Sequence, residues 1–138
     1  MQHRILVIDG QGGNLGAQLI KMIKEQLAKV EIRAVGTNSS ATNNMLKSGA
    51  HMAATGENAV IVGCRKAEVI VGPVGIVIAD ALLGEITPNM AKAVGQSEAV
   101  RVLIPVNKCE TLVAGVGGCT MTMLLQDAVD KIKDVFEA

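Results

Sequence analysis

The sequence predicts an α/β fold in which helices cover both faces of a mainly parallel sheet of about five or six strands. Short runs rich in Val and Ile alternate along the chain with amphipathic segments, which is typical of strands joined by crossover helices. Hydrophobic residues make up 49% of the 138 positions and aromatic residues only 1%. A core of aliphatic side chains suits strands that are buried on both faces. The length predicts one domain over residues 1–138.

The first strand, helix and second strand are predicted from simple patterns. Residues 4–9 form an apolar run, and a helix is expected over residues 13–29. Its apolar positions recur at helical spacing, at Leu15, Leu19, Ile23 and Leu27. The alternating, β-branched run over residues 30–36 predicts the second strand.

Capping residues define the next segment. Asn38, Ser39 and Ser40 are suitable N-caps for a short helix over residues 41–48, which Gly49 closes. A short third strand is expected over residues 50–54. The following helix is expected to run to Lys66, with Thr55 as its cap and Glu57 in its first turn.

The second half of the chain continues the alternation. Residues 68–71 predict a strand, and Thr87 followed by Pro88 predicts a helix start. That helix is expected to end near Gly95. β-Branched residues then predict strands over residues 100–106 and 111–116. A final amphipathic helix is predicted from apolar residues at helical spacing, Leu125, Val129, Ile132 and Phe136.

The glycine-rich turn after the first strand is the strongest functional signal. A strand, a glycine turn and a helix together favour binding of a nucleotide or dinucleotide, because glycine lets the backbone approach a phosphate and the helix N-terminus attracts an anion. The residues expected to bind the cofactor are Gly10, Gln11, Gly12, Gly13, Asn14 and Gly16. Of these, Gly10, Gly12, Gly13 and Asn14 are expected to hold the phosphates. The alternative is that the glycines only allow tight packing of strand against helix.

The three-residue spacing of Gly10, Gly13 and Gly16 resembles the turn of short-chain dehydrogenase/reductase-like proteins, which implies NAD or NADP as cofactor. Two departures limit this resemblance to the binding fold. Thr37, Asn38 and Ser39 follow the second strand, where NAD sites usually carry an acid. These side chains are expected near the ribose, although Asn38 and Ser39 also suit capping. The chain also has no Tyr, so the Tyr-x-x-x-Lys proton relay of those enzymes is absent.

Other candidate residues follow the later strands. Pro73 lies directly after a strand, at an edge where ligands bind in open α/β sheets. Glu57, Glu85 and Cys109 are weak candidates for catalysis, and Thr55, Asn107 and Lys108 are further candidates for lining the cleft. Each has a structural alternative: Glu57 favours its helix dipole, Glu85 is a solvated loop residue, and Cys109 is a buried, inert thiol. No metal site is expected, because His3 and His51 lack ligand partners at metal-binding spacing.

Composition excludes several partners. The formal net charge is zero, and the chain has no Trp, no Tyr and one Phe, which argues against nucleic-acid binding. The longest apolar stretch, residues 69–83, is too short and too interrupted to span a bilayer. The three cysteines form no C-x-x-C pair and are expected to be free thiols of a cytoplasmic protein.

Six segments of the chain carry a further resemblance: residues 9–13, 36–38, 54–59, 72–76, 84–88 and 104–109. Together they resemble a domain-of-unknown-function family of short bacterial proteins. The resemblance implies a Rossmann-like fold and a cytoplasmic bacterial protein, and it brings no activity and no catalytic residues.

Two functions are therefore expected from the sequence. The first is a nucleotide-binding protein with an NAD(P)-like ligand and an oxidoreductase-like activity. The second is a non-catalytic sensor or regulatory subunit that binds a nucleotide or another anionic metabolite. Residues 74–83 are more apolar than one loop requires. We therefore expect a buried helix or a subunit contact there, and a homo-oligomer.

Overall fold

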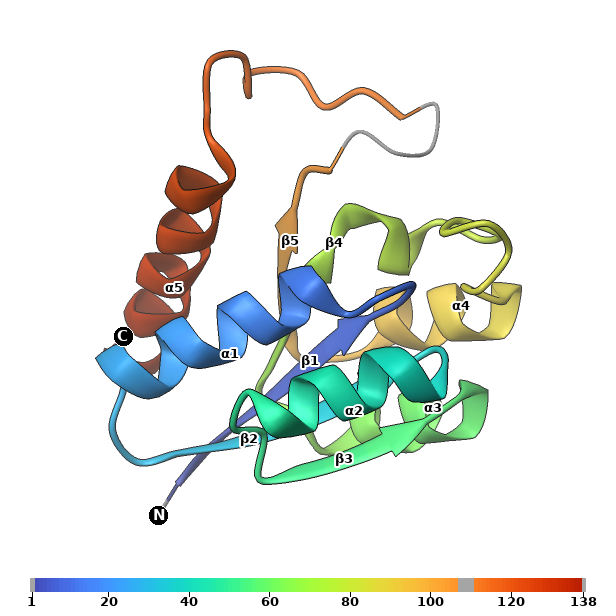
Figure 1. Cartoon of the computed structure of the whole chain (residues 1–138), viewed down its shortest axis with the longest axis horizontal. Coiled ribbons are helices and arrows are strands. Elements are labelled where there is room, and N and C mark those ends of the chain that lie inside the picture. The colour runs from blue at the N-terminus through green and yellow to red at the C-terminus, as the bar shows by residue number, and fades with distance from the viewer. Residues whose placement is uncertain (1, 107–110, 138) are drawn as a thin grey trace.

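A computed structural model of the chain describes residues 2–106 and 111–137. Five parallel strands form one sheet in the order β3-β2-β1-β4-β5 (Figure 1). The strands are β1 (His3–Asp9), β2 (Val30–Gly36), β3 (Met52–Thr55), β4 (Val69–Pro73) and β5 (Val100–Ile104). The helices are α1 (Asn14–Gln26), α2 (Ser39–Lys47), α3 (Glu57–Lys66), α4 (Pro88–Gln96) and α5 (Met121–Glu137), with a short 3₁₀ helix, η1 (Val74–Val77).

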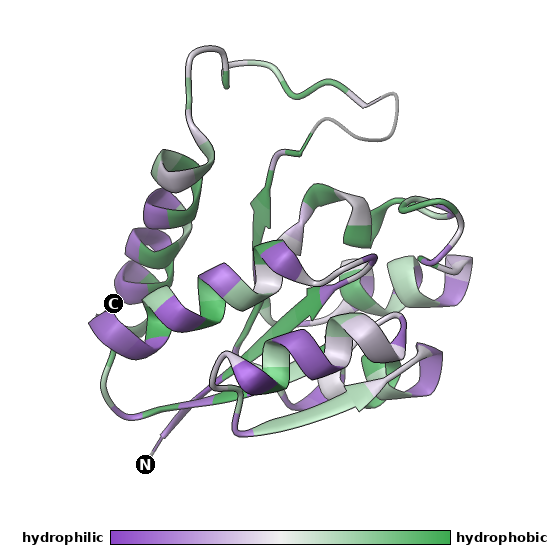
Figure 2. Ribbon diagram, viewed as in Figure 1, coloured by the Kyte–Doolittle hydropathy of each residue, from purple (hydrophilic) through white to green (hydrophobic). Residues whose placement is uncertain are grey.

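Successive side chains of β1 point to opposite faces of the sheet, so the core has two layers. Ile5 and Val7 pack with α1, α2 and α5 on one face of the sheet, whereas Leu6 and Ile8 pack with α3, α4 and η1 on the other. Figure 2 shows the hydrophobic strands at the centre and the hydrophilic outer sides of α1 and α5. The predicted three-layer αβα arrangement with a parallel sheet is confirmed.

Most predicted elements are present, and two predicted caps are seen in detail. β2 has the predicted bounds. Asn38 caps α2, since its Oδ1 accepts a hydrogen bond of 2.8 Å from the Ala41 N–H. Thr87 caps α4 by accepting from the Met90 N–H at 3.1 Å, and Pro88 is the first helical residue. None of the helices in the described part of the chain combines the length and apolar character that crossing a bilayer requires.

The predicted strand over residues 111–116 is wrong. These residues form no strand and extend away from the sheet before α5 (orange in Figure 1). The run has suitable β-branched residues, but a strand also needs a partner, and the described residues pair none of it with β5. Gly115 takes a left-handed φ of 88°, which interrupts an extended conformation.

Two further expectations need correction. Thr55 does not cap α3; it is the last residue of β3, and its hydroxyl lies 2.6 Å from the Thr42 hydroxyl. Residues 74–83 form only the short η1 helix followed by a loop. Their apolar character is explained largely within the chain, because Ile76, Ala81 and Leu82 are buried in the core.

Candidate functional site

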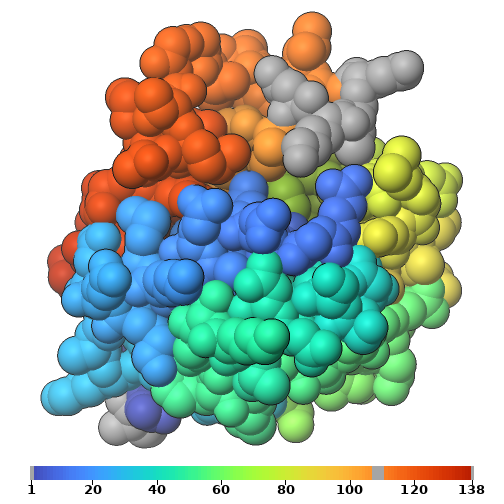
Figure 3. Space-filling view, viewed as in Figure 1, coloured from blue at the N-terminus to red at the C-terminus, as the bar shows by residue number. Residues whose placement is uncertain are grey.

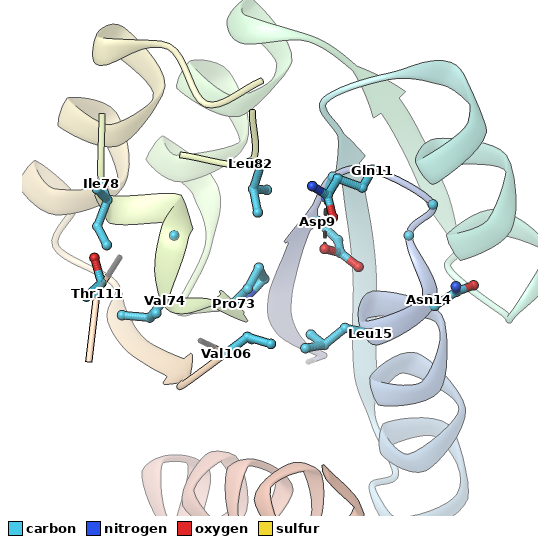
Figure 4. A pocket seen from close by; sticks show the side chains of 14 residues that line it. Asp9, Gln11, Asn14, Leu15, Pro73, Val74, Ile78, Leu82, Val106 and Thr111 are labelled. Carbon is cyan, nitrogen blue, oxygen red and sulfur yellow. Dashed lines mark hydrogen bonds between the residues drawn. The ribbon is translucent and has the colours of Figure 1, made fainter. Parts of the chain in front are cut away.

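A cavity of about 150 Å³ lies at the carboxyl ends of the strands, between β1 and β4. The chain leaves β1 toward β2 and β3 on one side of the sheet, and β4 and β5 lie on the other. Ligands bind at such a switch point in open α/β sheets. Figure 4 shows the turn after β1 on one side of the cavity, facing Pro73, Val74, Ile78 and Thr111.

Asp9, the last residue of β1, holds the turn against α1. Its side chain is buried, with 6% exposed. Oδ1 accepts a hydrogen bond of 2.8 Å from the Gly10 N–H, and Oδ2 accepts one of 2.7 Å from the Gly16 N–H in the first turn of α1. A carboxylate therefore stands at the positive end of the helix dipole, where it stabilises the helix and lines the cavity.

Gly13 and Gly16 are explained by packing. Gly13 has a left-handed φ of 73°, and a Cβ there would lie 2.7 Å from the Ala41 Cα and 2.8 Å from its carbonyl oxygen. A Cβ on Gly16 would lie 2.7 Å from the Met45 Sδ. The packing alternative thus accounts for two of the predicted phosphate-binding glycines, which bring α1 close to α2.

The part of the turn that is open to a ligand begins at Gly12. This residue is exposed and lines the cavity, and among the described residues a Cβ there would meet only the Asn14 side chain, at 3.6 Å. The first N–H groups of a helix have no acceptor within it. Asp9 accepts from the Gly16 N–H, and the Gly13 carbonyl accepts from the Ala17 N–H. The described residues provide no acceptor for the Asn14 and Leu15 N–H groups, so a ligand or water can bond to them.

Glu85 does not line the cavity, but it is hydrogen-bonded to the glycine turn beside it, a contact that the sequence did not predict. Its Oε1 accepts hydrogen bonds of 2.7 Å from the Gln11 N–H, 2.6 Å from the Thr37 hydroxyl and 3.2 Å from the Asn38 amide. Partial burial raises the pKa of Glu85, but these hydrogen bonds outweigh that effect and leave the pKa below its ordinary value. The alternative of a freely solvated loop residue does not hold.

The loop over residues 78–87 lies beside the glycine turn and contacts it. Ile78 and Leu82 line the cavity, while Glu85 reaches the far side of the turn. Figure 3 shows the blue turn at the surface between the start of α2 and this yellow loop. A Cβ on Gly10 would lie 2.6 Å from the Thr37 Oγ1 and 2.7 Å from the Glu85 Oε1. Gly10 therefore makes room for the contact between loop and turn.

Several predicted residues lie elsewhere. Glu57 does not line the cavity; it accepts hydrogen bonds from Thr87 and Asn89 and joins the starts of α3 and α4. Ser39 is exposed at the start of α2. Burial raises the pKa of the Cys64 thiol, in α3, to about 11. The candidates Asn107, Lys108 and Cys109 lie outside the described residues.

Comparison with known proteins identifies a family model and two solved structures that are similar to this chain. A family model described as a domain of unknown function (DUF3842) matches residues 4–137. No curated protein matches the chain. A dodecameric FMN-dependent UbiX-like decarboxylase from Escherichia coli O157:H7 is similar, with 14% identity, a TM-score of 0.47, and 99% of this chain and 96% of that chain covered.

A nucleoside-diphosphate-sugar epimerase from Pseudomonas aeruginosa is similar in structure as well. Its identity is 13% and its TM-score 0.47, with 96% of this chain and 47% of that chain covered. Neither protein's cofactor or substrate is carried over to this chain.

Proposed function

Because the chain belongs to the DUF3842 domain-of-unknown-function family, its function has to be inferred from its site, and we propose that it binds a nucleotide at the N-terminal glycine turn. The observation that carries the proposal is the cavity at the switch point between β1 and β4, where Gly12 is open to a ligand. The N–H groups at the start of α1 and its dipole favour an anionic group there.

The cavity limits how the nucleotide is placed. About 150 Å³ is below the range of roughly 300–1,000 Å³ for sites that enclose a drug-sized ligand. It therefore holds one group of the ligand, and the rest lies in the open groove along the turn. The carboxylate of Asp9 repels a phosphate at the base of the cavity. The phosphates are thus expected over Gly12 and Asn14, at the outer side of the turn.

An NAD(P)-like dinucleotide is the ligand that we propose for this site, in an oxidoreductase-like role. Thr37, Asn38 and Ser39 follow β2 on the ribose side, and Pro73 ends β4 on the cavity side. When bound, the nicotinamide would supply the hydride chemistry, and the protein would bind and orient it.

A non-catalytic sensor or regulatory subunit is the second candidate, and one observation favours it. Asp9 is the only acid or base among the described residues that line the cavity, and both its oxygens already accept backbone N–H groups. The described residues thus offer more for binding than for proton transfer. A turnover screen with bound cofactor separates the two candidates, since a sensor binds without turnover.

A homo-oligomer remains part of the proposal. Leu83, at the tip of the loop over residues 78–87, is 94% exposed. The proposal places this exposed apolar side chain in a contact with a second copy of the chain. Sedimentation that shows only monomer at tens of micromolar would exclude this contact at that concentration.

The first experiment uses the near absence of aromatic residues. Without Trp or Tyr the protein absorbs very little near 280 nm, so a nucleotide that copurifies is visible in the ultraviolet spectrum. The released ligand is identified by mass spectrometry, and NAD, NADP, AMP and ATP are then titrated by calorimetry. Release or binding of a nucleotide supports the proposal. Protein that releases none and binds none of the four contradicts it.

A further inference from the structure

We propose that Glu85 is the ribose-binding residue of the site, and that it selects ribonucleotides with a free 2′-hydroxyl over those with a 2′-phosphate. This inference rests on the proposed function and names the class of nucleotide that the site takes. It assigns to a loop after β4 a role that dinucleotide-binding folds usually give to an acid at the end of the second strand.

The placement of the carboxylate is the first argument. Residues 37–40, which follow β2, contain no acid. Glu85 instead reaches this position from the loop before α4 and contacts Thr37 and Asn38, the two residues directly after β2. It also accepts from the Gln11 N–H in the turn after β1. The carboxylate thus stands between the ends of β1 and β2, beside the expected path of the phosphates.

The remaining hydrogen-bonding capacity of the carboxylate is the second argument. Three donors converge on Oε1, whereas in the described part of the chain Oε2 accepts only the longer bond, 3.3 Å, from the Asn38 amide. A carboxylate offers about four acceptor positions. Because the Glu85 side chain is only partly buried, Oε2 can accept from a ligand, and two adjacent hydroxyls of a ribose are donors of the right kind.

The negative charge of the Glu85 carboxylate also favours a ligand without a 2′-phosphate. All three groups that bond to Glu85 in the described structure are neutral: a backbone N–H, a hydroxyl and an amide. They orient the carboxylate without cancelling its charge. A 2′-phosphate at this position would bring like charges together, which disfavours binding strongly. The site therefore suits NAD or an adenosine nucleotide better than NADP.

A purely structural role for Glu85 predicts a different outcome. If the carboxylate only fastens the loop to the glycine turn, the sugar of the ligand does not matter. Affinity would then be the same for a ribonucleotide and its 2′-deoxy form. The ratio of two affinities measured on one protein separates these roles, because the stability of the loop affects both ligands equally.

The test is calorimetric titration of the wild-type protein with AMP, 2′-deoxy-AMP, NAD and NADP. We expect 2′-deoxy-AMP to bind about tenfold more weakly than AMP, for the loss of a hydrogen bond to a charged group, and NADP at least about tenfold more weakly than NAD. Equal affinities within either pair would overturn the inference while leaving the proposed function intact. Failure of all four ligands to bind would refute the proposed function and this inference with it.

The Glu85→Gln variant adds a second test. Its amide oxygen can still accept from Gln11 and Thr37, so the loop contact is kept while the charge is removed. We expect the preference for NAD over NADP to fall about tenfold toward unity. Glu98→Gln, at an exposed glutamate after α4, is the matched control and should keep the wild-type ratio. An unchanged ratio in Glu85→Gln would contradict the proposed role.

Discussion

Alanine substitutions in the glycine turn test whether its glycines have the separate roles that the structure gives them. Gly13→Ala places a Cβ at a left-handed φ of 73° and 2.7 Å from the backbone of Ala41. Because these are backbone atoms, α2 as a whole would have to move. Gly12→Ala places its Cβ in open space, 3.6 Å from the nearest atom of the Asn14 side chain. The two variants change the same residue type at adjacent positions.

The expected difference in stability follows from these contacts. A left-handed alanine costs about 1–2 kcal/mol, and overpacking against backbone costs about 1–3 kcal/mol. The loss of unfolded-state freedom offsets about 0.4–1 kcal/mol of this in either variant. Gly13→Ala should therefore lower the free energy of unfolding by about 1–4.5 kcal/mol, whereas Gly12→Ala should leave it unchanged or raise it by up to about 1 kcal/mol.

Thermal unfolding followed by circular dichroism at 222 nm is the assay, since the chain has no Trp for fluorescence. For 138 residues the entropy of unfolding is about 0.29 kcal/mol per kelvin. The Tm of Gly13→Ala should fall by roughly 3–15 °C, and that of Gly12→Ala should stay the same or rise by no more than about 3 °C. A Gly13→Ala protein as stable as Gly12→Ala would refute the packing role of Gly13.

Three further predictions concern charges and thiols. Asp9→Asn should lower the free energy of unfolding, measured in urea, by about 1.5–3 kcal/mol, because an amide cannot accept from both the Gly10 and Gly16 N–H groups. An unchanged midpoint of urea unfolding would contradict this prediction. Timed alkylation at pH 8, read by peptide mass spectrometry, should label exposed Cys119 before buried Cys64, whose pKa is raised to about 11. The lowered pKa of Glu85 contributes stability that is present above the pKa of this group in the unfolded chain and is lost as pH falls through its lower pKa in the folded protein. The free energy of unfolding of Glu85→Gln should therefore fall less than that of the wild type between pH 5 and pH 3. If the two proteins show the same dependence of stability on pH, this carboxylate does not contribute to it.

Much of the fold could be predicted because local rules determine it. β2 has its predicted bounds, and the Thr87-Pro88 start of α4 follows from the geometry of a helix N-terminus. The strand predicted over residues 111–116 failed because strand formation depends on a partner. That run has the residue types of a strand and, in the described structure, no neighbour.

The candidate site could be predicted only in part. The glycine turn is contiguous in the sequence, so its position after β1 and before α1 was visible. Glu85 is separated from Gln11 by 74 positions and from Thr37 by 48. No local pattern encodes a contact over such a distance, and a glutamate in a glycine-flanked loop looks like a solvated residue. The division of roles between Gly12 and Gly13 likewise depends on α2, which the turn itself does not reveal.

If a nucleotide contacts the open backbone at Gly12, calorimetric titration of Gly12→Val with NAD should show weakened binding. Within the described part of the chain, a Cβ at this position meets only the Asn14 side chain, so the fold should be kept while the approach to the turn is blocked. Gly95→Val, at an exposed position of α4 where a Cβ meets nothing within 4 Å, is the control. We predict that wild type and Gly95→Val bind NAD and that Gly12→Val binds it at least about tenfold more weakly. Binding of equal strength by all three proteins, or by none, would contradict the account.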